Sequence, residues 1–247
     1  MPGSPEARDE EEDGVTTAHG RRNDDVWVVI PVFNEAPVLE SVIRQVLEVF
    51  PNVVCVDDGS GDGSAEVVLR TGAHLVRHPV NLGQGAALQT GLSYARVQPG
   101  AQYFVTYDAD GQHRLEDAAA MLEVARSGQA DVVLGTRFAD HAASVPLLKR
   151  VVLRVAVLLS PAGRKLRLTD AHNGLRVLTR PVADQLQISM NGMAHASEIV
   201  SYLGRSRWRV REIPVSIRYT EYSRSKGQSL LNGVNILFDL SVRHRGG

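Results

Sequence analysis

Short apolar runs alternate with amphipathic segments over the first half of the chain. The run at 26–32 is almost continuously apolar, which is typical of a strand that is covered on both faces. Over 38–50 the apolar residues recur every three or four positions, the spacing of a helix with one buried face. Further apolar runs predict strands at 53–56, 73–77, 103–107 and 131–134, and helical spacing predicts helices at 65–70, 84–95 and 115–127.

Five predicted strands that alternate with helices indicate βαβ units. We therefore expect an α/β fold whose central sheet is mostly parallel, has right-handed crossovers and is flanked by helices. The alternation stops after Arg137. The helix predicted at 144–159 is basic and amphipathic, so it is interpreted either as a membrane-surface contact or as a solvated face over a core. Beyond it, the pattern predicts strands at 173–178 and 209–219 and helices at 181–186, 196–203 and 230–242.

Composition divides the chain into three parts. Residues 1–25 are rich in Glu, Asp, Gly and Pro and have a net charge of −5, which predicts a disordered acidic tail. A main domain is expected over 26–228, and an amphipathic helix with a basic end over 229–247. The net charge of the whole chain is −1, so no global field favours nucleic acid as a partner.

Membrane spans and leader segments are not expected. No apolar run reaches the roughly 18 residues that a membrane span requires, and the N-terminal residues do not form the core of a signal peptide. We therefore expect a soluble or peripheral protein.

The clearest candidate chemistry lies at 108–113, Asp-Ala-Asp-Gly-Gln-His. In an extended backbone, the carboxylates of Asp108 and Asp110 project to the same side roughly 6 to 7 Å apart. Two anions this close repel unless a cation lies between them, and hard oxygen ligands on a loop suit Mg²⁺ or Mn²⁺. Gln112 or His113 could complete the ligand set. The alternative is a plain turn in which the Asp side chains cap backbone amides.

Polar loops follow several of the predicted strands. Ligands of parallel sheets bind at the carboxyl ends of the strands, so the convergence of these loops predicts a site for a nucleotide and a metal. The loops lie at 34–35, 57–58, 108–110 and 136–137. Gly83 and Gly85 lack the spacing of a dinucleotide fingerprint and the Gly-Lys-Ser/Thr ending of a P-loop, so both of those interpretations are rejected.

Basic residues are concentrated near the C-terminus. Between 205 and 226 seven basic residues stand against Glu212 and Glu221. This excess suits an anionic substrate, and the alternative is a solvated strand with ordinary basic side chains.

Seven segments together make the sequence recognisable. They are Val-Ile-Pro-Val-Phe-Asn-Glu at 29–35, Val-Asp-Asp-Gly-Ser at 56–60, Asn-Leu-Gly-Gln-Gly-Ala-Ala-Leu at 81–88, the 108–113 segment, Gly-Thr-Arg-Phe at 135–138, the Asp-x-x-x-Gly-x-Arg segment at 170–176, and Ser-Arg-Ser-Lys at 223–226. With them the chain resembles the family 2 glycosyltransferases of GT-A fold, most closely the branch that includes dolichol-phosphate mannose synthases and bacterial polyprenyl-phosphate sugar transferases. The motifs are highly specific for the superfamily and less so for one sugar or acceptor.

The resemblance implies a role for each loop. Asp108, Asp110 and Gln112 would hold Mg²⁺ or Mn²⁺ on the donor diphosphate, where the cation acts as a Lewis acid during a single inverting displacement. Asp108, Asp110 and Arg137 are thus the expected catalytic residues. The nucleotide would be bound by Pro31, Val32, Asn34, Glu35, Asp57 or Asp58, Gly85, Asp108 and Ala109. The phosphate of the acceptor would meet Arg137, Lys149, Arg150, Arg224 and Lys226, because guanidinium groups suit phosphate oxygens.

The acceptor decides whether a base is needed. A hydroxyl acceptor requires a general base, for which Glu198 and His195 are the candidates. A phosphate monoester, with a second pKa of about 6, is already largely dianionic at neutral pH. We therefore expect transfer of a hexose from a UDP- or GDP-sugar to a polyprenyl phosphate, by a protein that lies on the cytoplasmic, inner face of the membrane.

Two alternatives stay open. The first is transfer to a hydroxyl group of a glycan, lipid or small molecule. The second is a nucleotide-sugar-binding protein without turnover, although the intact pair of Asp108 and Asp110 speaks against it.

The sequence departs from the family pattern at two points. Gln84 stands where many relatives have a basic residue, which leaves one phosphate contact open. Relatives in this branch often continue into transmembrane helices. Here we expect membrane contact through the basic helix at 144–159, the C-terminal helix or a small membrane protein.

Overall fold

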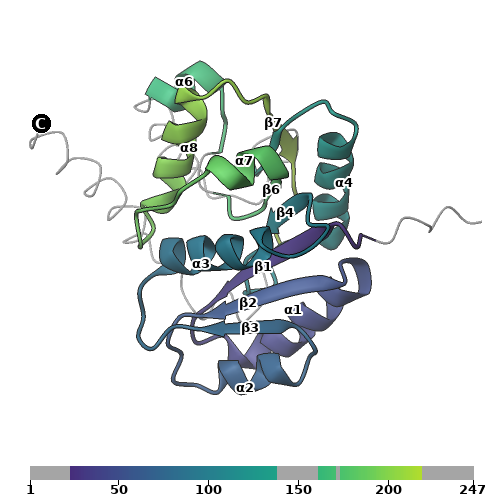
Figure 1. Ribbon diagram of the computed structural model, residues 1–247, viewed down its shortest axis with the longest axis vertical. Coiled ribbons are helices and arrows are strands. Elements are labelled where there is room, and N and C mark those ends of the chain that lie inside the picture. Colours follow the sequence, from purple (N-terminus) through teal and green to yellow (C-terminus); the bar gives the residue numbers. More distant parts are fainter. Residues whose placement is uncertain (1–22, 138–160, 171–172, 219–247) are drawn as a thin grey trace, which may run out of the picture.

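The computed structural model describes residues 23–137, 161–170 and 173–218, which form a sheet with helices on both faces (Figure 1). The predicted alternation of five strands and four helices is confirmed: β1 (Val26–Val32), α1 (Ala36–Val49), β2 (Asn52–Asp57), α2 (Ser64–Leu69), β3 (His74–Arg77), α3 (Gln84–Arg96), β4 (Tyr103–Thr106), α4 (Leu115–Arg126) and β5 (Val132–Thr136). After these come α6 (Pro161–Leu166), β6 (Arg176–Thr179), α7 (Arg180–Gln185), α8 (His195–Arg205) and β7 (Val210–Pro214).

The sheet is mostly parallel, as the sequence predicts. Its strand order is β3-β2-β1-β4-β6-β5-β7, and β6 runs antiparallel to both of its neighbours. The other strands point the same way. One edge of the sheet therefore carries the carboxyl ends of β1, β2, β4, β5 and β7 together with the amino end of β6.

Two apolar cores separate the sheet from its helices. On one face, strand residues such as Ile30 and Val105 pack against α1, α2 and α4. On the other face, Val29 and Phe104 pack against α3, α7 and α8. Nearly every residue of β1 and β2 is buried, which explains why their sequences read as continuous apolar runs.

Two predicted strands are shorter than expected. The strand predicted from 173 begins at Arg176, because the side chain of Asn173 accepts a hydrogen bond from the Leu175 amide and makes a turn there. The strand predicted to 219 ends at Pro214. Beyond Pro214 the backbone leaves the ladder, and the amide of Arg218 donates to the Gln112 carbonyl instead.

Some predicted segments lie outside the described residues. These are the tail up to residue 22 and the helices at 144–159 and 230–242. In the part of the chain that the structure describes, no helix has the length and apolar character needed to cross a membrane.

Helix α3 packs closely on the sheet at Gly91. A Cβ at Gly91 would lie 2.3 Å from Cγ1 of the buried Val29, a distance that forces strand and helix apart. We expect Gly91→Ala to lower the free energy of unfolding by roughly 1 to 3 kcal/mol, measured by urea denaturation. Gly61→Ala is the matched control, because nothing lies within 4 Å of its Cβ position. Equal stability of the two variants would contradict the packing.

Candidate active site

The loops after β1 and β2 hold each other in place. Asn34 adopts a left-handed backbone with φ of 54°, and its Oδ1 accepts a hydrogen bond from the Gly61 amide at 3.0 Å. In return, Ser60 Oγ accepts from the Asn34 amide at 2.9 Å and Ser64 Oγ from the Glu35 amide at 3.0 Å. These reciprocal bonds fix the loop predicted to carry the nucleotide, and Pro31 and Val32 lie buried at the end of β1 beneath it.

The two adjacent carboxylates at the end of β2 have different surroundings. Asp57 is fully buried, pairs with Arg77 Nε at 3.1 Å and accepts from the Ser60 amide at 3.1 Å. Asp58 accepts from the amides of Leu82 and Gly83 at 2.9 and 2.7 Å and contacts His78 Nδ1 at 2.7 Å. Asp58 therefore positions the loop that leads into α3.

The first turn of α3 is occupied by protein. The amides of Gly85 and Ala86 both donate to the Asn191 carbonyl, at 2.7 and 3.3 Å. A Cβ at Gly85 would lie 2.0 Å from the Met190 carbonyl oxygen, so only glycine permits this approach. The structure thus places Gly85 against the loop that precedes α8, and its amide is bonded to protein.

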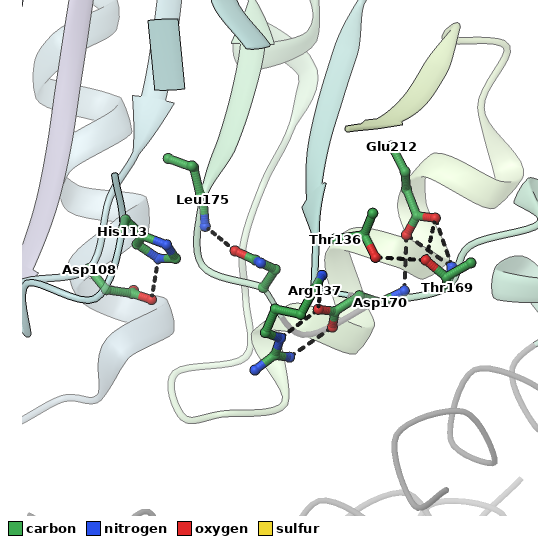
Figure 2. A network of polar contacts seen from close by, with 9 residues as sticks. Asp108, His113, Thr136, Arg137, Thr169, Asp170, Leu175 and Glu212 are labelled. Atoms are coloured by element: carbon green, nitrogen blue, oxygen red, sulfur yellow. Dashed lines mark hydrogen bonds and ion pairs between the residues drawn. The ribbon is translucent and has the colours of Figure 1, made fainter. Parts of the chain in front are cut away.

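Asp108 is held through both of its carboxylate oxygens. Its Oδ1 accepts from the Gln84 side chain at 3.1 Å. Its Oδ2 contacts His113 Nε2 at 3.0 Å, as Figure 2 shows. A Cβ at Gly174 would lie 2.0 Å from Oδ2, so the carboxylate lies directly on the backbone of that glycine. Burial would raise the pKa of Asp108, but the hydrogen bond and charge of His113, assisted by Arg176, hold this pKa below its ordinary value.

The pKa of Asp110 is shifted in the opposite direction. Burial and then the negative charge of Asp108 raise the pKa of Asp110 to about 6. Its Oδ1 accepts from the Gln112 amide at 3.0 Å. Ala109, between the two carboxylates, is buried. The loop therefore holds two repelling carboxylates close together, an arrangement that an added cation would relieve.

Arg137 is held by an acidic partner at the end of β5. Its Nε and Nη2 contact the two oxygens of Asp170 at 2.6 and 2.8 Å, a bidentate ion pair that is drawn in Figure 2. Asp170 is almost completely buried, whereas 17% of the Arg137 side chain is exposed. The pair fixes the guanidinium at the same edge of the sheet as Asp108.

Arg176 lies between these two carboxylates. It is 3% exposed, and burial lowers its pKa while Asp108 and Asp170 raise it. Its Nη1 finds no hydrogen-bond partner among the described residues. Acidic and basic groups thus alternate along the edge, from Asp108 through Arg176 and Asp170 to Arg137.

The two candidate bases occupy the start of α8. Glu198 accepts hydrogen bonds from the amides of Ser189 and Met190 and from the Ser189 hydroxyl. Burial would raise the pKa of Glu198, but these bonds lower it below its ordinary value. His195 is buried, its Nδ1 contacts the Gly192 carbonyl at 2.8 Å, and its charge contributes to the low pKa of Asp108.

Comparison with known proteins identifies the family of this chain. The model of the family "Glycosyl transferase family 2" matches residues 27–186, more than half of the 247 residues. The chain belongs to glycosyltransferase family 2. The enzyme is 30% identical to an uncharacterized protein of Methanocaldococcus jannaschii over 89% of this chain and 92% of that protein.

One further relative and one solved structure extend this picture. The glycosyltransferase is 25% identical to the UDP-N-acetylglucosamine–dolichyl-phosphate N-acetylglucosaminyltransferase of Methanococcus voltae over 90% of this chain and 96% of that enzyme. It superposes with a TM-score of 0.62 on glucosyl-3-phosphoglycerate synthase from Mycobacterium tuberculosis, solved with Mn²⁺, UDP and its product, at 17% identity and with 89% and 80% of the two chains covered. The fold is therefore the expected GT-A fold.

The acidic loop of the glycosyltransferase offers oxygen ligands that suit a hard cation. Asp108 and Asp110 provide carboxylate oxygens, and Gln112 is the neighbouring amide on the same loop. No group of three or more His, Cys, Asp or Glu side chains arranged for a metal occurs within the described ranges. A cation here would thus depend on two carboxylates, with its remaining ligands from an amide, water or a substrate phosphate, as is usual for Mg²⁺.

Several predicted residues are not placed. Lys149, Arg150, Arg224 and Lys226, all predicted to bind the acceptor phosphate, lie outside the described residues.

Sequence reasoning also missed parts of the site. The individual roles of Asp170, Gly174 and Arg176 were not predicted, although the Asp-x-x-x-Gly-x-Arg pattern marked them as a unit. Nothing in the sequence indicated that the Glu212 carboxylate accepts hydrogen bonds from the amides of Thr169 and Asp170.

The raised pKa of Asp110 predicts a pH-dependent stability. Well below pH 4 this carboxyl is protonated in both the folded and the unfolded chain and has no effect. As the pH rises from about 4 to the folded pKa of about 6, Asp110 increasingly lowers the free energy of unfolding, because the folded protein disfavours its charged form. We therefore expect Asp110→Asn, without divalent cations, to raise the free energy of unfolding by roughly 1 to 2 kcal/mol at pH 7.5.

The measurement is urea denaturation in EDTA from pH 4.5 to 7.5, with exposed Asp184→Asn as a control for loss of a charge. The gain from Asp110→Asn should shrink as the pH falls. A gain that is constant across this range would show that Asp110 titrates normally.

Proposed function

We propose that this glycosyltransferase moves a hexose from a UDP- or GDP-sugar to a polyprenyl phosphate, with Mg²⁺ or Mn²⁺ held by Asp108, Asp110 and Gln112. The observation that carries the proposal is the single edge of the sheet at which an acidic pair and a fixed arginine meet. When bound, the cation supplies Lewis-acid stabilisation of the leaving nucleoside diphosphate. Asp108 is already oriented for such a role by Gln84, His113 and Gly174.

The acceptor side is supported by three observations. Arg137 is held in one orientation by Asp170, and its side chain is partly exposed at the edge that carries Asp108. The chain leaves β7 along the same edge, where the Arg218 amide donates to the Gln112 carbonyl at 2.9 Å. In the sequence, Arg224 follows Arg218 by six residues. Lys149, Arg150 and Lys226 complete the proposed phosphate contacts.

A phosphate acceptor also agrees with the state of Glu198. A carboxylate that accepts two amides and a hydroxyl and has a lowered pKa is a poor proton acceptor. Transfer to a hydroxyl would need an effective general base, whereas transfer to a dianionic phosphate needs none. The relatives named for dolichyl phosphate and undecaprenyl phosphate acceptors support the same choice. Binding at the membrane surface, directly or through a small membrane protein, is part of the proposal because the acceptor is a lipid.

The test of function is nucleotide release by the purified protein. UDP-, GDP- and dTDP-sugars are each supplied with Mn²⁺, Mg²⁺ or EDTA, and with or without a short polyprenyl phosphate. We expect release that requires both the cation and the lipid phosphate. It should fall on the order of 100-fold or more in Asp110→Ala, because the cation loses a carboxylate, and stay near the parent rate in Glu198→Gln.

Asp184→Ala is the matched control, since this exposed carboxylate pairs only weakly with Arg180 four residues away. Release that ignores the lipid phosphate and is lost in Glu198→Gln would replace the proposal with transfer to a hydroxyl acceptor. Binding of nucleotide-sugar with no release under any condition would indicate a protein without turnover.

The contact between Asp108 and Gly174 predicts the effect of one added methyl group. In Gly174→Ala the Cβ would lie 2.0 Å from Asp108 Oδ2 and 2.4 Å from its Cγ, so the carboxylate must move away. We expect the affinity for Mn²⁺, measured by electron paramagnetic resonance, to fall about tenfold or more because ligand orientation is lost. Gly61→Ala should bind Mn²⁺ as the parent does. Unchanged affinity in Gly174→Ala would argue against Asp108 as a ligand.

A further inference from the structure

One carboxylate on the edge strand β7 organises the backbone beside Arg137. Glu212 Oε2 accepts from the Thr169 amide at 2.8 Å and from the Thr169 hydroxyl at 2.9 Å. Its Oε1 accepts from the Asp170 amide at 3.0 Å. Figure 2 shows the Glu212 side chain extending from β7 to this pair of residues. Two consecutive amides are therefore bound by one side chain from a strand more than forty residues away.

The segment is also fixed to β5. The hydroxyls of Thr136 and Thr169 are 2.7 Å apart, and Thr136 immediately precedes Arg137. The Val215 amide donates to the Thr136 carbonyl at 2.9 Å, so the end of β7 and the end of β5 are joined on the backbone as well. Thr169 thus lies between two strand ends, with its amide and its hydroxyl both engaged.

Asp170 connects this fixed backbone segment to Arg137. Its carboxylate makes the bidentate pair with the guanidinium and in addition accepts from the Arg137 amide at 3.2 Å. Because Asp170 is 1% exposed, its side chain has little freedom once the backbone is set. The orientation of the Arg137 guanidinium therefore depends on the Asp170 backbone, which is bound by Glu212.

We propose that Glu212 is a positioning residue that sets the orientation of Arg137 toward the acceptor, without touching a substrate itself. The inference rests on the proposed function only in that Arg137 meets the acceptor phosphate. Glutamate suits the role because it has two carboxylate oxygens for three donors. In Glu212→Gln one of those oxygens becomes an amide nitrogen that faces a backbone N–H, so part of the clamp is lost while the size of the side chain is kept.

The experiment has a readout that needs no substrate. In the full-length ¹⁵N-labelled protein, the Nε–H signal of Arg137, assigned with Arg137→Gln, reports exchange with solvent. We expect this exchange to become about tenfold faster in Glu212→Gln, because the ion pair to Asp170 opens more often. Thr169→Val, which removes only the hydroxyl, should give a smaller increase. Arg209→Gln is the matched control, because it breaks the exposed pair with Asp131 near the other end of β7.

Kinetics provide the second readout. In Glu212→Gln the KM for polyprenyl phosphate should rise about five- to twentyfold, while the KM for the nucleotide-sugar stays unchanged. In the background of Arg137→Gln, Glu212→Gln should add almost nothing, because both changes remove the same interaction. A merely structural role would raise both KM values or give additive effects, and either result would overturn the proposal.

The two proposals can fail separately. Unchanged Nε–H exchange in a folded Glu212→Gln protein overturns the positioning role, whatever the acceptor is. Faster exchange supports the positioning role even if the parent enzyme never releases nucleotide with polyprenyl phosphate, a result that would overturn the proposed function alone.

Discussion

The close approach of Asp108 to the backbone of Gly174 is the constraint on which the site depends. It brings a carboxylate from the end of β4 into contact with the turn before β6, where a side chain would occupy the same space. Asp108 then lies beside His113 and near Arg176, which keep it ionised despite its surroundings. At Asp110 the hydrogen bond from the Gln112 amide and the charge of His113 are outweighed, so that burial and then the negative charge of Asp108 raise its pKa. The protein's own side chains thus stabilise the charged form of Asp108, whereas the charged form of Asp110 is disfavoured when no cation is present.

The antiparallel strand β6 explains how the two halves of the site are joined. Because its amino end lies among the carboxyl ends of β4 and β5, a single segment presents Asp170, Gly174 and Arg176 to both neighbours. Arg176 is attracted by Asp108 on one side and by Asp170 on the other. If β6 were parallel to β4 and β5, its amino end would lie at the opposite edge of the sheet, and these residues would be far from the acidic loop. The reversed strand is therefore as important for the site as the parallel ones.

The sequence contained the local part of this arrangement but not the long-range part. Continuous apolar runs and helical spacing depend on near neighbours, so β1 to β5 and their helices could be predicted, as could the gathering of Asn34, Asp57 and Asp108 at one edge. The direction of β6 depends on which strands it pairs with, and that choice is made by tertiary packing. The same holds for Glu212, whose role requires Thr169 to arrive from a different part of the chain. Polar side chains that bind distant backbone amides have no periodicity to reveal them.

The first turn of α3 shows what the departure at Gln84 means physically. Its amides, which could otherwise face a phosphate, donate to the Asn191 carbonyl, and the Gln84 side chain is directed to Asp108. A basic side chain at this position would place a positive charge beside Asp108, where it would compete with a cation. A neutral amide orients the carboxylate without that competition. In the proposed reaction, the diphosphate charge would then be balanced by the cation and by arginines from other loops, so the acidic pair carries a larger share of donor binding.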